Sequence, residues 1–122
     1  MREMAGTQRR KTRGKSLRPP RISKARLRAM IEEATVDCYD ESEQVSGFFT
    51  MIEDNLHVPF ETLILGISVV VEQVDLNDRE DIVVVCSRGD ERLSIHLLDV
   101  PLPSPPPEGA EWIEAYRLWA RG

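Results

Sequence analysis

The sequence predicts an α+β domain, a small antiparallel β meander (SH3-like or barrel-like) packed with an N-terminal and a C-terminal helix. Three observations predict this class. Apolar residues recur at helical spacing after Ser23, β-branched residues dominate residues 65–100, and aromatic residues recur at helical spacing near the C-terminus. A chain of 122 residues is long enough for one domain of this kind.

The charge of the chain is divided between two regions. Residues 1–28 carry eleven Lys or Arg against one acid, a net charge of +10, whereas residues 29–122 carry five against twenty, a net charge of −15. Residues 1–22 are basic, poor in large apolar side chains and interrupted by Pro19 and Pro20, a composition that predicts a disordered arm. Residues 23–122 then form the single folded domain. The arm either clamps nucleic acid phosphates or another anionic surface, or is a solubilising extension, or folds back electrostatically on the acidic body.

The first helix is expected to begin near Ser23, a favourable N-cap residue after the Pro-Pro pair. Leu27, Met30 or Ile31, and Ala34 recur at helical spacing and face the core. Basic residues open this helix and Glu32 and Glu33 close it, which opposes the helix macrodipole. The helix therefore depends on tertiary packing.

The remaining elements follow in order. Residues 44–56 form a short helix or a strand, with a slight preference for helix, and 53–55 form a turn or cap. Strands are predicted over 65–76, 81–88 and 92–100. After an extended proline-rich spacer at 101–107, a helix docks on the sheet through Trp112, Ile113, Tyr116 and Trp119.

The acidic segment between the first two elements is the main candidate site. Eight carboxylates and no basic residue lie between Ile31 and Asp54: Glu32, Glu33, Asp37, Asp40, Glu41, Glu43, Glu53 and Asp54. Self-repulsion penalises such a density, and a hard cation with six to eight oxygen ligands relieves it. Asp37, Asp40 and Glu41 could converge at the helix exit, and Glu53 with Asp54 could join them from the following turn. The pattern alone still favours a solvated acidic face.

The segment does not follow the EF-hand pattern. With Asp40 as the first ligand, Val45 stands where the loop requires Gly and Met51 where it requires a bidentate Glu. The stretch that begins at Asp75 has Arg79 at its fifth position. A calcium site in this chain is therefore of a different kind.

A family resemblance extends over residues 24–121. The runs IEEATVDCYDESEQVSGFFTMIEDNLHVPFE, LGISVVVEQVDL and EGAEWIEAYRLW resemble, in order and spacing, the small calcium-binding family named after the cyanobacterial protein CcbP. The resemblance implies a cytosolic Ca²⁺ buffer or sensor without an EF-hand. It points to Asp37, Asp40, Glu41 and Glu43 as a group, and next to Glu53 and Asp54, with Cys38 and Tyr39 as inward-facing anchors. The basic arm departs from the compact acidic members of this family.

Other function classes are disfavoured by the sequence. No P-loop, GxSxG, HExxH or GxGxxG motif is present, and His57 and His96 are the only histidines, so no enzyme is expected. No apolar run approaches the ~20 residues that cross a bilayer. Cys38 and Cys86 lack metal-ligand spacing and are expected to stay reduced in a cytoplasmic protein.

Overall fold

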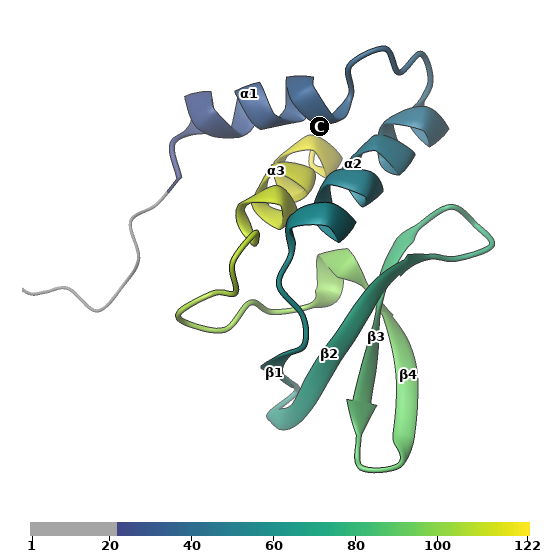
Figure 1. Cartoon of the computed structure of the whole chain (residues 1–122), viewed down its shortest axis with the longest axis vertical. Coiled ribbons are helices and arrows are strands. Elements are labelled where there is room, and N and C mark those ends of the chain that lie inside the picture. Colours follow the sequence, from purple (N-terminus) through teal and green to yellow (C-terminus); the bar gives the residue numbers. More distant parts are fainter. Residues whose placement is uncertain (1–21) are drawn as a thin grey trace, which may run out of the picture.

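The computed structural model describes residues 22–122, in which three helices lie beside one antiparallel sheet (Figure 1). The helices are α1 (Lys24–Ala34), α2 (Glu41–Asn55) and α3 (Glu111–Ala120), and a short 3-10 helix, η2, spans Leu97–Asp99. The strands are β1 (Phe60–Ile64), β2 (Ile67–Leu76), β3 (Ile82–Arg88) and β4 (Glu91–His96). The α+β class and the antiparallel meander are confirmed.

The sheet is an open meander in the order β1-β2-β3-β4, with β1 and β4 as its edges. It therefore does not close into the barrel-like form that the sequence suggested. Alternate residues of the strands point to the covered face, where Val71, Val84 and Cys86 are fully buried. A register shift between Val71 and Gln73 interrupts the pairing of β2 with β3, and such a bulge increases the local twist.

The helices form a layer of their own over one end of the sheet (Figure 1). The α1 helix contacts α2 and α3, and α2 contacts both α3 and β2. The aromatic rings of Phe48, Tyr116 and Trp119 fill the centre of this layer, with ring centroids 5.2–5.8 Å apart. The predicted stripe on α3 is therefore core, but it packs mainly against α1 and α2 instead of docking on the sheet as expected.

The α1 helix begins and packs as the sequence predicts. The Ser23 side chain accepts a hydrogen bond from the backbone N–H of Arg26 at 3.1 Å, and Met30 and Ala34 are buried. The first turn has no acidic residue and the last turn no basic one, so the unfavourable charge order is present as well. Packing against α2 and α3 is what stabilises this helix.

Gly47 sets the close approach of α1 and α2. A Cβ atom at this position would collide with the carbonyl oxygen of Ala34, the last residue of α1. Since glycine in a helix interior costs stability relative to alanine, its presence here is explained by this contact. The contact also fixes where the 35–40 connection starts.

Three sequence predictions differ from the structure. Residues 41–55 form one helix of 15 residues, so Glu41 and Glu43 belong to its first turn and Glu53 and Asp54 to its last. The predicted strand over 92–100 ends at His96 and continues as η2, which turns Leu97 into the core. A further strand, β1, precedes the predicted ones.

Candidate functional site

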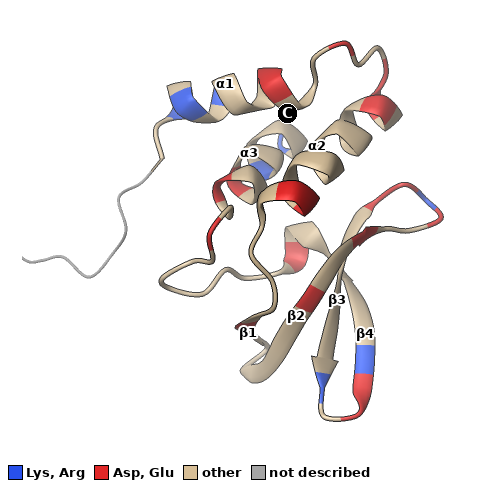
Figure 2. Cartoon of the chain, in the orientation of Figure 1, with Lys and Arg blue, Asp and Glu red and all other residues tan. Residues whose placement is uncertain are grey.

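All six predicted ligands lie on the surface, but they do not form one cluster. Asp37 and Asp40 precede α2, Glu41 and Glu43 begin it, and Glu53 and Asp54 end it. Thirteen residues separate Glu41 from Asp54, a rise of about 20 Å along a helix. The expected convergence of the two acidic stretches is therefore wrong, because α2 is one continuous helix. Acidic residues mark both of its ends in Figure 2.

The N-terminal end of α2 resembles a capping box, except that Glu43 reaches the N–H of Tyr39, one residue before the N-cap Asp40. The Asp40 carboxylate accepts a hydrogen bond from the Glu43 backbone N–H at 2.8 Å, and Glu43 Oε1 accepts one from the Tyr39 N–H at 2.6 Å. These bonds satisfy backbone donors at the helix start, and negative charge there is favoured by the macrodipole. Asp40 and Glu43 consequently have a structural role, and each retains carboxylate lone pairs for a further partner.

The connection between α1 and α2 differs from the sequence expectation. Tyr39 is 87% exposed, so it is no inward-facing anchor. Cys38 is half-buried, with its sulfur 3.4 Å from the Glu43 carbonyl oxygen and 3.5 Å from that of Val36. Asp37 adopts a positive φ of 60°, a conformation that Asn and Asp tolerate better than most residues. Of the two expected anchors, only Cys38 is therefore half-buried.

A second acidic segment, the β2–β3 loop at residues 77–81, meets the N-terminal end of α2. The Ser42 hydroxyl donates a hydrogen bond to Glu80 Oε1 at 2.6 Å. Asn77 Oδ1 orders the loop by accepting hydrogen bonds from the N–H groups of Arg79 and Asp81, at 2.9 and 3.0 Å. Figure 2 shows this loop as a projection beyond the sheet that carries acidic residues and one basic residue, Arg79.

The buried phenol of Tyr116 is influenced by both acidic segments. Burial of its phenol, together with the negative charges of Asp81 and Glu41, raises the pKa of Tyr116 above its ordinary value. Glu41 and Asp81 are forty residues apart in the sequence, and the contact that joins their segments is the Ser42–Glu80 hydrogen bond. We refer to Asp37, Asp40, Glu41, Glu43, Glu80 and Asp81 as the acidic junction. The sequence analysis missed Glu80 and Asp81, and only the Asp and Asn residues around position 77 hinted at them.

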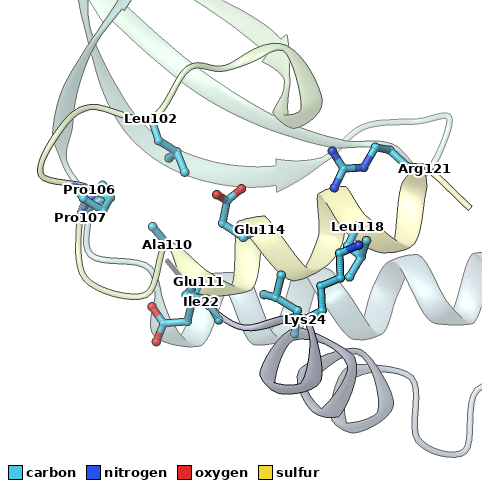
Figure 3. Close-up of a pocket in the computed structure, with 11 residues that line it drawn as sticks. Ile22, Lys24, Leu102, Pro106, Pro107, Ala110, Glu111, Glu114, Leu118 and Arg121 are labelled. Atoms are coloured by element: carbon cyan, nitrogen blue, oxygen red, sulfur yellow. The ribbon is translucent and has the colours of Figure 1, made fainter. Parts of the chain in front are cut away.

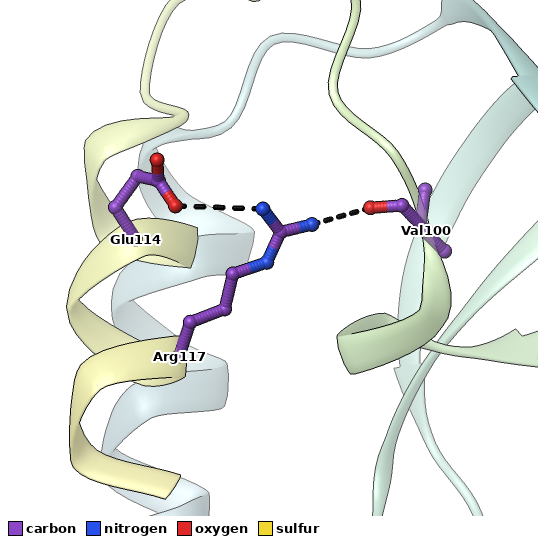
Figure 4. A network of polar contacts seen from close by, with 3 residues as sticks. All are labelled: Val100, Glu114 and Arg117. Atoms are coloured by element: carbon purple, nitrogen blue, oxygen red, sulfur yellow. Dashed lines mark hydrogen bonds and ion pairs between the residues drawn. The ribbon is translucent and has the colours of Figure 1, made fainter. Parts of the chain in front are cut away.

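Lys and Arg are scarce in the sequence of the acidic junction, although Arg79 lies beside Glu80 in the β2–β3 loop. No Lys or Arg occurs from residue 29 to residue 78, a stretch that contains twelve Asp or Glu. Within residues 22–122, the recorded ion pair joins Arg117 Nη1 to Glu114 Oε1 at 3.4 Å, on α3. Arg117 also donates to the Val100 carbonyl and so connects α3 to the segment that leaves the sheet (Figure 4).

The donor set of the acidic junction suits a hard cation. Carboxylates, the Ser42 hydroxyl and the Asn77 amide oxygen are the ligand types that Ca²⁺ takes. In the described part of the chain, no three His, Cys, Asp or Glu side chains already converge closely enough to hold a metal ion. Binding at the junction therefore requires side-chain movement, backbone carbonyls or water as additional ligands.

The described residues assemble no nucleophile and base. Cys86 is buried in β3, and burial raises the pKa of its thiol, which makes it less reactive. Cys38 and Cys86 are not joined to each other in a disulfide. Among residues 22–122, no helix is long and apolar enough to cross a membrane.

Comparison with known proteins identifies the class first by its fold. A solved structure described as a calcium-binding protein in the calcium-binding form matches with a TM-score of 0.64 and 20% identity, covering 78% of this chain and 89% of that chain. The crystal structure of Anabaena CcbP matches with a TM-score of 0.65 and 20% identity, covering 84% and 94%. The fold is thus that of small calcium-binding proteins. No curated protein matches the sequence.

The family assignment comes from the sequence itself. The model of the CcbP-type family, described as calcium binding, matches residues 28–120. The chain therefore belongs to the CcbP-type calcium-binding family, and the resemblance noted from its sequence is confirmed.

Proposed function

We propose that this chain binds Ca²⁺ reversibly at the acidic junction and acts as a cytosolic calcium buffer or sensor. The observation that carries the proposal is the 2.6 Å hydrogen bond from the Ser42 hydroxyl to Glu80 Oε1, which joins the start of α2 to the β2–β3 loop. Two separate elements thereby contribute carboxylates to one region. Membership of a calcium-binding family supports the choice of ion.

The proposed ligands differ in whether their carboxylates already accept hydrogen bonds within the protein. Glu41 and Asp81 make no recorded hydrogen bond through their carboxylates to another described residue, so they supply the primary ligands. Asp40 and Glu43 each accept one capping hydrogen bond and contribute remaining lone pairs. Asp37 is exposed on the connection before α2. Glu53 and Asp54, at the far end of α2, form a separate and weaker candidate.

The coordination requirements of the two ions favour Ca²⁺ over Mg²⁺ at this region. Ca²⁺ accepts irregular shells of six to eight oxygens, whereas Mg²⁺ demands a tight octahedron and loses water reluctantly. Surface carboxylates that must move to converge fit the first requirement and not the second. We expect a Kd for Ca²⁺ between about 10⁻⁶ and 10⁻⁴ M, the range of sensor and weaker sites.

Isothermal titration calorimetry of the full chain tests this proposal. Ca²⁺ should give a saturable heat and raise the melting temperature, and millimolar Mg²⁺ should displace it poorly. Absence of both heat and thermal stabilisation at millimolar Ca²⁺ would show the proposal to be wrong.

The alternative function, binding of a polyanion by the predicted basic arm, concerns residues 1–21, which lie outside the described residues. Such binding should weaken steeply with ionic strength, because each neutralised phosphate releases counterions. Binding of single-stranded nucleic acid that is insensitive to salt, or unchanged when Arg9, Arg10 and Lys11 are replaced by Gln, would contradict it.

A further inference from the structure

A groove lies on the opposite end of α1 from the acidic junction. It has a volume of about 670 Å³ and runs between α1, α3 and the proline-rich segment that precedes α3 (Figure 3). This volume is within the range of ligand pockets. Its apolar wall is formed by Leu27, Leu102, Pro106, Pro107, Ala110 and Leu118. Leu27 and Leu118 come from the two helices, so an occupant would bridge α1 and α3.

The chain itself leads into this groove. Ile22, the first described residue, is one of its lining residues and is half-buried there. The groove wall therefore includes the residue to which Arg21 is covalently joined. The stretch nearest to it, residues 17–21, reads Leu-Arg-Pro-Pro-Arg.

The composition of residues 17–21 matches the groove. Leu17, Pro19 and Pro20 offer apolar surface to the leucine and proline wall, and proline-rich segments dock at a small entropic cost because their backbone is already restricted. Arg18 and Arg21 flank the prolines, and the groove presents the Glu111 and Glu114 carboxylates. Lys24 and Arg121 also line it, so local ion pairs alone would not hold the segment.

The overall charges supply the remaining attraction. Residues 1–21 carry eight Lys or Arg against one acid, a net charge of +7, while residues 22–122 carry eight against twenty, a net charge of −12. Opposite charges of this size draw a tethered segment to the body. The covalent link keeps its effective concentration near the millimolar range.

We propose that residues 17–21 of this chain occupy the groove between α1 and α3 and hold the two helices together. The proposal is independent of calcium binding, because the groove and the acidic junction are at different ends of α1.

Limited trypsin digestion of the full chain in EDTA tests the proposal. Leu118 lines the groove, half-buried on α3, and is not among the residues that pack against the core, so Leu118→Asp changes the groove with little risk to the fold. Cleavage after Arg21 should be about fivefold faster in Leu118→Asp than in the wild type, because proteolysis follows the population of the open form. Leu17→Ser, which alters the other side of the proposed contact, should accelerate this cleavage to the same extent. The double variant should be cleaved little faster than either single variant.

Two controls keep the result interpretable. Leu93→Asp makes the same change at a 49% exposed leucine on β4 and should leave cleavage after Arg21 unchanged. Cleavage after Arg88, in the β3–β4 turn, should stay slow in every variant if the body remains folded. Equal cleavage after Arg21 in the wild type, Leu118→Asp and Leu17→Ser would overturn the proposal. Protection that rises with protein concentration would also overturn it, because the occupant would then be a neighbouring copy.

Discussion

The two ends of α2 carry the same kind of charge in opposite settings. At the N-terminal end, the carboxylates cap the helix, follow its macrodipole and face a second acidic loop. At the C-terminal end, Glu53 and Asp54 are exposed in a last turn that contains no basic residue, so they oppose the macrodipole. The carboxylates at the N-terminal end thus stabilise the helix, whereas Glu53 and Asp54 at the C-terminal end do not.

The comparison narrows what sets the N-terminal end apart. Both ends have carboxylates adjacent in sequence, and both meet another acidic segment, because the Glu108 carbonyl oxygen accepts a hydrogen bond from the His57 N–H at 2.8 Å just beyond the C-terminal end. At the N-terminal end a side chain of α2 also bonds to a carboxylate of the facing loop, from Ser42 to Glu80. The proposed cation site therefore depends on the contact with the β2–β3 loop and not on charge density along the sequence.

The largest effect is expected from moving the N-terminal half of α2. Gly47→Ala should lower the free energy of unfolding by about 1–3 kcal/mol, because the new methyl group collides with the Ala34 carbonyl and overpacks the α1–α2 contact. Ser46→Ala, at the neighbouring exposed position, is the matched control. Urea denaturation measures both variants, and equal stability would show that α1 and α2 are not in close contact.

Calcium affinity should separate the two ends next. Glu41→Gln combined with Asp81→Asn should weaken Ca²⁺ binding about tenfold, equivalent to about 1.4 kcal/mol. Glu53→Gln combined with Asp54→Asn removes the same charge from the other end and should change the affinity far less. Calorimetry decides between them. A larger loss from the second pair would move the site to the C-terminal end of α2.

In calcium-free solution, removing a carboxylate from each end of α2 should change the free energy of unfolding in opposite directions, by less than the change at Gly47. Asp40→Ala should destabilise the protein by about 1 kcal/mol through loss of the N-cap hydrogen bond. Asp54→Ala should stabilise it by a few tenths of a kcal/mol by removing negative charge from the helix C-terminus. Thermal denaturation at low ionic strength measures both changes. Equal shifts in the same direction would contradict the contrast between the ends.

The smallest effect is on the ionisation of Tyr116, whose pKa is raised by burial and then by Asp81 and Glu41. The folded state favours the neutral phenol, so its contribution to stability is complete below the ordinary tyrosine pKa of about 10 and is lost as the pH rises through the folded pKa. Glu41→Gln should lower the pKa of Tyr116, and Glu53→Gln should not. Tyrosinate absorbance in a Tyr39→Phe background measures this, and identical titrations would place Glu41 away from the phenol.

Local signals predicted much of the fold. Each of these signals involves residues that are close together in the sequence. They are the N-cap at Ser23, the β-branched runs of β2 and β3, and the aromatic stripe of α3. The start of α2 was also readable, because Asp40 and Glu43 have the spacing of a capping box. It was missed because Gly47 lowered the apparent helix propensity, and the reason for that glycine, the Ala34 carbonyl, is in another element.

The remaining features depend on contacts between distant residues. The aromatic stripe of α3 predicts burial but not the partner, so docking on the sheet and packing against α1 and α2 looked alike. Glu80 and Asp81 approach α2 only through the return of the β2–β3 loop. Their place beside Glu41 follows from the sheet register and the bulge in β2, which no short stretch of sequence encodes.

The position of α3 also has a consequence for biosynthesis. Because α3 fills the space between α1 and α2 with Tyr116 and Trp119 against Phe48, the helical layer joins residues more than sixty positions apart. A nascent chain on the ribosome can pair its strands while α3 is still being made, but Phe48 stays uncovered until then. Contacts of such long sequence separation slow folding and prolong the exposure of apolar surface. Phe48 therefore gains its aromatic neighbours only after the strands have been made.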